Sequence, residues 1–246
     1  MKSEFYFKSI YGNIHYQDIG QGETIIMLHA TPRSSESFKK LALYLSKIYR
    51  IISIDTIGFG KSANIPLNTS INLIADIKIQ LIESLGLKKV NIFGLHTGNK
   101  IATAVAGRAP LLVNNLIICG MTHSIILDKI KRKKSIKKIL DSNAISKIDI
   151  DKNEQNERIR SKRSIDIIYK ANFEFDLESE ASKVIANTLI LELCTEEEEY
   201  LGNQALPLSN LFKNGTFKRI DGSDRFFLEK QYSVLGDIIN KYIKLK

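Results

Sequence analysis

The sequence contains few cysteines and no leading apolar segment. Among its 246 residues are only two cysteines, Cys119 and Cys194, and each closes an apolar, strand-like run. Two such residues do not make a disulfide framework, and their setting predicts buried, reduced thiols. Residues 1–10 mix charged and aromatic side chains without a continuous apolar core. We therefore expect neither a signal peptide nor a membrane anchor, and the expected location is cytoplasmic.

The basic residues lack the aromatic neighbours that are typical of a nucleic-acid-binding surface. The formal net charge is +9, from 36 Lys and Arg against 27 Asp and Glu. A basic run lies within residues 129–138 and contains no aromatic side chain. Surfaces that bind single-stranded nucleic acid usually combine basic with aromatic side chains, so we expect no nucleic-acid partner. A solvated basic helix is the favoured interpretation, and an anionic small molecule drawn to the same face is the alternative.

No internal repeat is visible, and strand-like and helix-like segments alternate along the chain. This alternation predicts an α/β fold with a mostly parallel, eight-stranded sheet and helices on both faces. The length suits a single domain. Expected strands are 5–10, 12–19, 24–28, 51–55, 90–93, 115–119, 187–193 and 216–220; expected helices are 35–48, 70–85, 100–106 and a last one aligned on 235, 238, 239 and 242.

The alternation of strand-like and helix-like segments stops after His123. Residues 124–182 have a helical, charged and weakly patterned sequence, and the next strand signal begins at 187. We interpret 1–123 and 183–246 as the core, and 124–182 as a helical cap inserted between two strands. Such an insertion is either a lid that covers a pocket or a surface excursion without a gating role.

A short motif, Gly94-Leu95-His96-Thr97-Gly98, has the spacing of a nucleophile elbow, G-x-S-x-G, with histidine at its centre. An apolar run at 90–93 precedes it, and a helix-like run at 100–106 follows it. Glycines flank such a turn because strand and helix backbones approach closely there. The motif therefore predicts a sharp strand-to-helix turn that presents an imidazole.

Two further segments carry the same signal. His29-Ala30-Thr31-Pro32 is similar to an H-G-x-P loop after the third strand, and residues 55–62 are similar to D-x-x-G-F-G-x-S after the fourth. In this order and context the three motifs resemble those of the α/β-hydrolase superfamily, over nearly the whole chain. The resemblance implies the α/β-hydrolase fold with a cap, but fold alone does not give activity.

The resemblance also implies where the family's catalytic groups fall. The order is nucleophile, acid, histidine, and the matching positions are His96, Glu196 and Arg225. The acid could lie anywhere in the run from Glu196 to Glu199. Arg225 stays protonated and cannot accept a proton, so the ordinary serine-hydrolase cycle is excluded in this alignment. Arg225 either pairs with Glu196 or binds a substrate carboxylate or phosphate through two parallel hydrogen bonds.

His96 has two interpretations. Histidine tolerates positive φ, so it could occupy the elbow for steric reasons alone. The alternative, which we favour, is a base or nucleophile at the floor of a pocket. The positive end of the following helix and the nearby Arg225 both disfavour an imidazolium, so we expect a neutral ring.

Other site residues follow from the resemblance. The backbone N–H groups of Thr31 and Thr97 fall on the oxyanion-hole positions. His29 is expected to order its loop by hydrogen bonding and is also a candidate substrate contact, as is His123 at the pocket rim. His15 has no evident partner. The four histidines lack metal-ligand spacing, so we expect no metal, and nothing in the sequence requires a cofactor.

These residues predict an enzyme that acts on a small, anionic carbonyl or ester compound without a Ser-His-Asp triad. Hydrolysis, lyase, isomerase and cofactor-free oxygenase chemistry all remain open. The alternative is a non-catalytic member that binds a ligand or serves as a scaffold, because two of three catalytic positions are replaced. The expected partner is a small molecule, and the sequence does not determine the oligomeric state.

Overall fold

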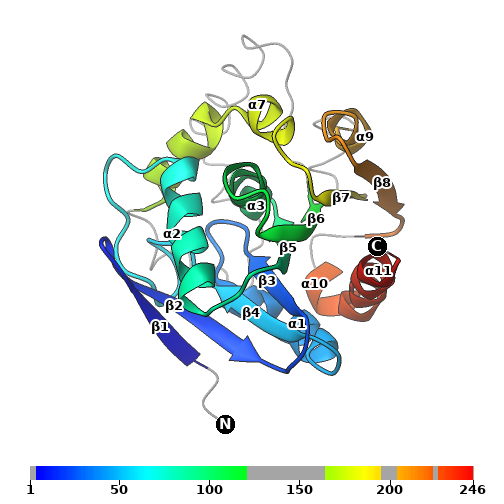
Figure 1. Cartoon of the computed structure of the whole chain (residues 1–246), viewed down its shortest axis with the longest axis horizontal. Coiled ribbons are helices and arrows are strands. Elements are labelled where there is room, and N and C mark those ends of the chain that lie inside the picture. The colour runs from blue at the N-terminus through cyan, green and yellow to red at the C-terminus, as the bar shows by residue number, and fades with distance from the viewer. Residues whose placement is uncertain (1–3, 121–163, 195–203, 224–226, 246) are drawn as a thin grey trace.

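The computed structural model describes residues 4–120, 164–194, 204–223 and 227–245, and within them one sheet forms the centre of the molecule (Figure 1). Its strand order is β1-β2-β4-β3-β5-β6-β7-β8. The strands are β1 Glu4–Ser9, β2 Gly12–Ile19, β3 Thr24–Leu28, β4 Arg50–Ile54, β5 Val90–Leu95, β6 Val113–Cys119, β7 Asn187–Leu193 and β8 Gly215–Ile220. The eight-stranded sheet expected from the sequence is confirmed.

The sheet is mixed but mostly parallel. β2 pairs antiparallel with both β1 and β4, whereas the remaining neighbours pair in parallel. β3 lies between β4 and β5, so the loops that follow these three strands leave the same edge of the sheet side by side. The strand order reverses at β3, because β4 lies on one side of it and β5 on the other. Ligand sites of open α/β sheets lie outside the carboxyl ends of the strands, near a reversal of this kind.

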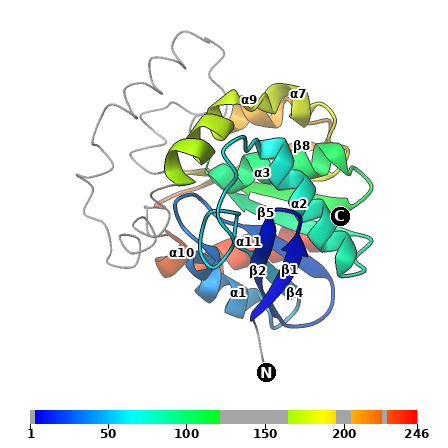
Figure 2. The same ribbon diagram turned by 90° about the vertical axis from the view of Figure 1, so that its left-hand side faces the viewer.

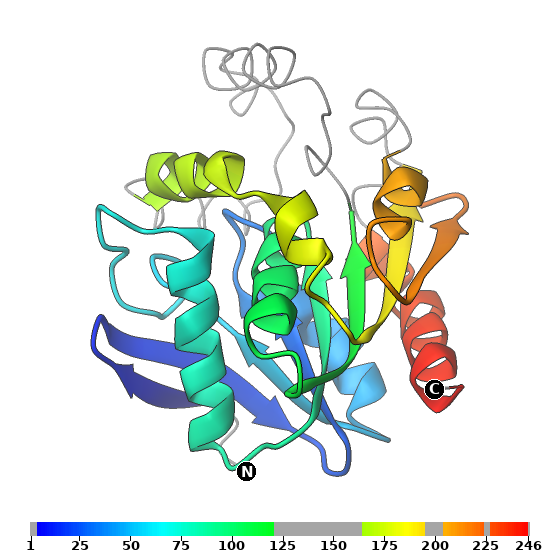
Figure 3. The same ribbon diagram turned by 45° about the horizontal axis from the view of Figure 1, so that its top comes forward.

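Helices cover both faces of the sheet (Figures 1 and 3). An apolar cluster lies between each face and its helices. One face carries α2 Ile71–Ser84, α3 Thr97–Arg108, α7 Leu177–Ala181 and a helix over residues 164–174; the other carries the 3₁₀ helix η1 Ser35–Phe38, α1 Lys39–Leu45, α10 Phe227–Lys230 and α11 Tyr232–Lys244. The short α9, Ala205–Ser209, packs on β7 and β8.

The helix predicted at 70–85 shows how local sequence sets its ends. The Ser70 hydroxyl accepts a hydrogen bond from the Leu73 N–H at 3.1 Å and caps the first turn of α2. Gly86 follows the helix with φ of +71°, a conformation that glycine adopts without cost. Ile71, Ile74 and Leu81 are buried on the sheet side, as their spacing predicts.

The helix predicted at 35–48 is shorter than expected. It begins as η1, continues as α1 and ends at Leu45. Ile48, the last residue of the predicted helix, is 49% exposed, and Tyr49 is buried instead. The N–H groups of Ile48 and Tyr49 both donate to the Leu45 carbonyl, so the chain turns there to enter β4. Because of that turn, the side chain that faces the core is that of Tyr49 and not that of Ile48.

The two cysteines differ from the prediction in one respect. Neither Cys119 nor Cys194 forms a disulfide, and Cys119 is fully buried at the end of β6. Cys194 is only partly buried, because β7 ends at Leu193 and the cysteine lies beyond the last covered position. Its sulfur accepts a hydrogen bond from Arg219 Nε at 3.0 Å.

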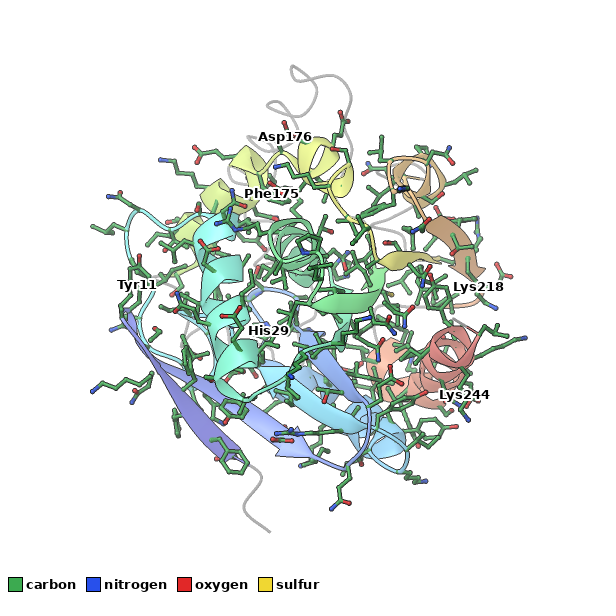
Figure 4. The ribbon with its side chains drawn as sticks, in the orientation of Figure 1. Tyr11, His29, Phe175, Asp176, Lys218 and Lys244 are labelled. Carbon is green, nitrogen blue, oxygen red and sulfur yellow. The ribbon has the colours of Figure 1, made fainter. Side chains whose placement is uncertain are left out.

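Part of the segment that we interpret as a cap packs on the core. Ile168, Phe175 and Leu177 are buried in the same cluster as α2 and α3, and Figure 4 labels Phe175 beside α7. Figure 2 shows this segment from the side, next to α2 and α3. Residues 124–163 of the segment lie outside the described residues. Within the described parts of the chain, no helix is long and apolar enough to cross a membrane.

A candidate active site at the His96 turn

His96 occupies a sharp turn between β5 and α3. Its φ of 49° and ψ of −111° make it the only non-glycine residue with positive φ in the described parts of the chain. A Cβ on Gly98 would collide with the Leu28 carbonyl, and one on Gly94 would lie 2.6 Å from the Gly98 carbonyl oxygen. The predicted elbow geometry and the reason for its two glycines are thus present. Strain of this kind persists where the surrounding structure enforces it.

The imidazole lies against the end of the neighbouring strand. The His96 N–H donates to the Cys119 carbonyl at 3.0 Å, and its own carbonyl accepts from the Asn99 N–H at 2.9 Å. A Cβ built on Gly120 would lie 2.7 Å from His96 Cε1 and 2.9 Å from each ring nitrogen. His96 therefore packs on the Gly120 backbone while keeping partial exposure.

The His96 ring is neutral at pH 7. Burial and, to a smaller extent, the positive charge of Arg33 together lower its pKa from 6.5 to about 4. The direction of this shift agrees with the expected neutral ring, and among the described residues its causes are burial and Arg33. The positive charge that lowers this pKa belongs to Arg33, a residue that the sequence analysis did not consider. The residue that it named instead, Arg225, lies outside the described residues.

Arg33 belongs to the loop that follows β3. A cis peptide bond joins Thr31 to Pro32, and the Arg33 N–H donates to the Ala30 carbonyl at 3.0 Å. The Arg33 guanidinium, 19% exposed, donates from Nη1 to Glu229 Oε1 of α10 at 3.1 Å. The sequence feature that could have pointed to Arg33 as a site residue is its position directly after the His29-Ala30-Thr31-Pro32 motif.

The two predicted oxyanion-hole residues are in contact. The hydroxyls of Thr31 and Thr97 lie 2.8 Å apart, and both residues are buried. This bond joins the loop after β3 to the first turn of α3. Among the described residues, neither backbone N–H donates to a protein acceptor. The two residues on the predicted oxyanion-hole positions are thus in contact through their hydroxyls, and the role of their N–H groups stays a prediction.

His29 is a structural residue in this arrangement. It is fully buried, its Nδ1 donates to the Ala30 carbonyl at 2.8 Å, and its Nε2 accepts from the Thr56 N–H at 2.9 Å. Burial lowers its pKa, which agrees with a neutral ring. Figure 4 labels it in the interior. The predicted loop-ordering role is present, but both nitrogens are occupied, so His29 is left out of the proposed ligand contacts.

His15 has a partner that the sequence did not reveal. Its Nδ1 donates to Asp55 Oδ2 at 2.8 Å, inside the protein. The same carboxylate accepts from the Ser35 N–H at 2.7 Å and the Lys61 N–H at 2.8 Å. Burial alone would raise the pKa of Asp55, but these hydrogen bonds outweigh it and hold the pKa far below its ordinary value. The expectation that His15 lacks a partner was wrong.

Three predicted site residues, Glu196, Arg225 and His123, lie outside the described residues, so their positions stay predictions. Within the described part of the chain, no group of three or more His, Cys, Asp or Glu side chains could hold a metal ion. The residues brought together there are His96, Thr31 and Thr97, with Arg33, Asn99 and Gly120 added by the structure.

Comparison with protein families agrees with this geometry. Residues 23–153, just over half of the chain, match the family described as alpha/beta hydrolase fold. This chain belongs to that family. The α/β-hydrolase motifs at 29–32, 55–62 and 94–98 all lie inside the matched region.

Relatives of this α/β-hydrolase include named hydrolases. The (E)-2-((N-methylformamido)methylene)succinate hydrolase of Acinetobacter baylyi is 29% identical over 127 residues, which are 50% of this chain and 48% of the relative. A 2-hydroxy-6-oxononadienedioate/2-hydroxy-6-oxononatrienedioate hydrolase of Pseudomonas putida is 32% identical over 113 residues, 44% of this chain and 40% of the relative. The matched region thus spans about half or less of these relatives' length.

Solved structures resemble the fold over the whole chain. A thermophilic esterase from Thermogutta terrifontis, with malate bound, superposes with a TM-score of 0.80 at 18% identity, covering 99% of this chain and 98% of the esterase. A hydrolase from Pseudomonas aeruginosa superposes with a TM-score of 0.79 at 11% identity, covering 98% of each chain. At these identities the likeness establishes the fold of this α/β-hydrolase alone.

Proposed function

We propose that this α/β-hydrolase-fold chain is an enzyme that acts on a small, anionic carbonyl or ester compound, with His96 as base or nucleophile. The observation that carries the proposal is the placement of a neutral imidazole in the elbow, beside the Thr31–Thr97 pair and near the charge of Arg33. Catalysis by a triad is not required in this scheme.

The scheme for hydrolysis uses His96 twice. Its neutral ring takes a proton from water as the water oxygen attacks the substrate carbonyl carbon, and the carbonyl oxygen becomes an oxyanion. The N–H groups of Thr31 and Thr97 stabilise that charge. When the carbon–oxygen bond to the leaving group breaks, the imidazolium returns its proton to the departing alkoxide.

The low pKa of His96 makes the two halves of this scheme unequal. A ring with a pKa of about 4 is almost entirely neutral at pH 7 but is a weak base. Its conjugate acid is correspondingly a strong proton donor. Because the ring is unprotonated at pH 7, His96 delivers only a proton that it has first taken from water or from the substrate, so lyase and isomerase chemistry, in which a proton is taken from one atom and returned to another, also fit.

An anionic substrate fits the charge next to the ring. Arg33 supplies a positive charge near His96, and Arg225, from its place in the motif, would add a second. The relatives' names include a succinate and a dienedioate, both carboxylates. Carboxylates bind guanidinium groups through charge-assisted hydrogen bonds, so the same chemical class suits this site.

The remaining parts of the proposal concern residues that were placed by motif. Glu196, or a neighbour up to Glu199, would pair with Arg225, and His123 would lie at the pocket rim. Residues 124–182 would form the cap, in a cytoplasmic protein.

A second candidate function is ligand binding without turnover. The specific observation in its favour is the same low pKa of His96, combined with the replacement of the elbow serine. A weak base beside the Arg33 guanidinium would still leave a site that binds a carboxylate.

The test compares wild type with His96→Asn on short acyl esters, thioesters and carboxylated ketones. Asn tolerates positive φ, so this variant removes the base and keeps the elbow, whereas His96→Ala also strains it. We expect kcat/KM to fall about 10²- to 10⁴-fold. Equal turnover by both proteins would remove His96 from the mechanism. Carboxylate binding by wild type, measured calorimetrically, without turnover of any compound would favour the second candidate.

A further inference from the structure

Gly120 contacts the face of the His96 ring. A Cβ on Gly120 would lie almost equally far from three ring atoms, 2.7 Å from Cε1 and 2.9 Å from Nδ1 and Nε2. A point in the ring plane could not be so near to all three, so the added carbon would meet the face of the imidazole. Real Cβ atoms do not approach this closely, and only glycine allows the ring to lie where it does.

Hydrogen bonds on both sides fix the position of Gly120. Its N–H donates to the Leu191 carbonyl of β7 at 3.3 Å, and its carbonyl accepts from Asn99 Nδ2 at 2.6 Å. Its φ of +74° is again one that favours glycine. The backbone surface under the ring is therefore held from β7 and from α3.

Asn99 joins the elbow to the end of β6. Its Nδ2 also donates to the Cys119 carbonyl at 2.9 Å, and its Oδ1 accepts from the Cys119 N–H at 3.0 Å. Asn99 is 1% exposed, so these bonds form away from water, where their geometry is strongly enforced. Its own N–H donates to the His96 carbonyl at 2.9 Å. Asn99 thus ties the backbone of His96, through its own N–H, to the backbone on which the ring lies, through its side-chain amide.

We propose that Gly120 and Asn99 are positioning residues for His96: the bare backbone of Gly120 forms the seat of the imidazole, and the Asn99 amide holds that seat in place. A histidine ring is larger than the serine side chain usual at an elbow, and it needs a flat, closely placed surface to keep one orientation. The proposal deepens the proposed function, because it concerns the same ring. Its structural content can nevertheless be measured without any substrate.

The test uses Gly120→Ala with Gly86→Ala as the matched control. Gly86 also has positive φ, +71°, but a Cβ there meets nothing within 4 Å, so the control carries the backbone strain without the ring contact. The measurement is the ¹⁵N chemical shifts of labelled histidine, with His96 identified by loss of its signals in His96→Asn. In wild type and Gly86→Ala the His96 ring should stay neutral from pH 5 to pH 8.

In Gly120→Ala the ring must leave its seat and become more exposed. We expect its pKa to rise towards 6.5, so that His96 titrates between pH 5 and pH 8, and we expect kcat to fall tenfold or more with KM changed less than twofold. Shifts identical to those of wild type at every pH would overturn the proposal.

A second pair of variants covers the case in which Gly120→Ala does not fold. Asn99→Ser removes the amide clamp, and Asn115→Ser removes another buried amide of the same sheet region, one that donates to Asn91 Oδ1 at 2.8 Å near the opposite end of β6. Only Asn99→Ser should make His96 titrate in this window, and equal behaviour of the two variants would contradict the seat. If His96 titrates in these variants but the wild-type protein turns over no compound, the proposed function alone is refuted. If wild type has an activity that depends on His96 but the variants leave the His96 shifts unchanged, the positioning role of Gly120 and Asn99 alone is refuted.

Discussion

At the scale of single residues, the site depends on how one imidazole is kept neutral. Burial does most of this, and the Arg33 guanidinium adds to it. The strained backbone of His96 gives no such electrostatic effect by itself. It only aims the side chain, at a cost that the rest of the turn must offset. The proton affinity of His96 is therefore adjustable by a neighbour without disturbing the elbow.

Arg33→Gln should raise the pKa of His96, because it removes a positive charge that disfavours the imidazolium. The ring must be neutral to act, so the acid limb of kcat/KM should move from near pH 4 to higher pH. The shift should stop short of 6.5, since burial, the larger cause, remains. Arg33→Lys keeps the charge and should leave the limb near its wild-type position. The check is the pH dependence of kcat/KM for a neutral ester, and an unmoved limb in Arg33→Gln would exclude this electrostatic role.

The same variant should also change substrate preference. An anionic ester should lose at least tenfold in kcat/KM relative to its neutral isostere, because a charge-assisted hydrogen bond contributes on the order of 1.5–3 kcal/mol. Both esters are measured at pH 7.5, where the His96 ring is neutral in either protein. Equal losses for the two esters would show that Arg33 does not select for charge.

At the scale of elements, the loop after β3 is fastened to the loop after β4 at two points. His29 accepts from the Thr56 N–H, and Asp55 accepts from the Ser35 N–H. Asp55 also holds β2 through His15. Thr31, between these anchors, is thus carried on a braced loop, which is what a preorganised oxyanion hole needs.

Asp55→Asn should lower the free energy of unfolding by about 3 kcal/mol, because an amide cannot accept all three hydrogen bonds that the buried carboxylate accepts. Denaturant unfolding at pH 7 measures this. Asp18→Asn is the matched control: its carboxylate pairs with Arg50 in a partly exposed position and should cost about 1 kcal/mol or less. Since the pKa of Asp55 is depressed in the folded state, its contribution is present above the unfolded value of about 4 and is lost as pH falls below it.

Local patterns predicted most elements, whereas contacts between elements had to be seen in the structure. The cap at Ser70 and the stop at Gly86 are readable from the sequence because both act within one turn of α2. The pair His15–Asp55 spans 40 residues and depends on β2 lying next to β4, an order that hydrophobic periodicity does not encode. The same applies to Gly120, whose contact with the ring of His96 depends on β6 lying next to β5.

At the scale of the whole molecule, one buried charge bears on global stability. Lys78 lies on the inner side of α2, fully buried, and its Nζ donates to the Asp55 carbonyl oxygen at 2.9 Å. Burial lowers its pKa from 10.5 to about 7, although the nearby Asp55 charge opposes the shift. Neither site chemistry nor the motifs require a lysine there, so its effect should be seen in unfolding.

The sign of that effect follows from proton binding. Between about pH 7 and pH 10.5 the unfolded chain binds more protons at Lys78 than the folded chain does, so stability should rise with pH across this window. The penalty removed is on the order of 5 kcal/mol. Below pH 7 both states carry the proton and the full penalty persists. Lys78→Met should therefore be more stable than wild type at pH 6, and the difference between the two should shrink as pH rises towards 10.

Urea unfolding of both proteins at pH 6, 8 and 10 measures this difference, and it cancels the titration of the groups that the two proteins share. Lys89→Met, at an exposed position just before β5, should track wild type at every pH. If the free energies of unfolding of wild type and Lys78→Met differ by the same amount at every pH, then the protonated lysine is in contact with water or an anion. The apolar layer between α2 and the sheet would then be less closed than its packing implies.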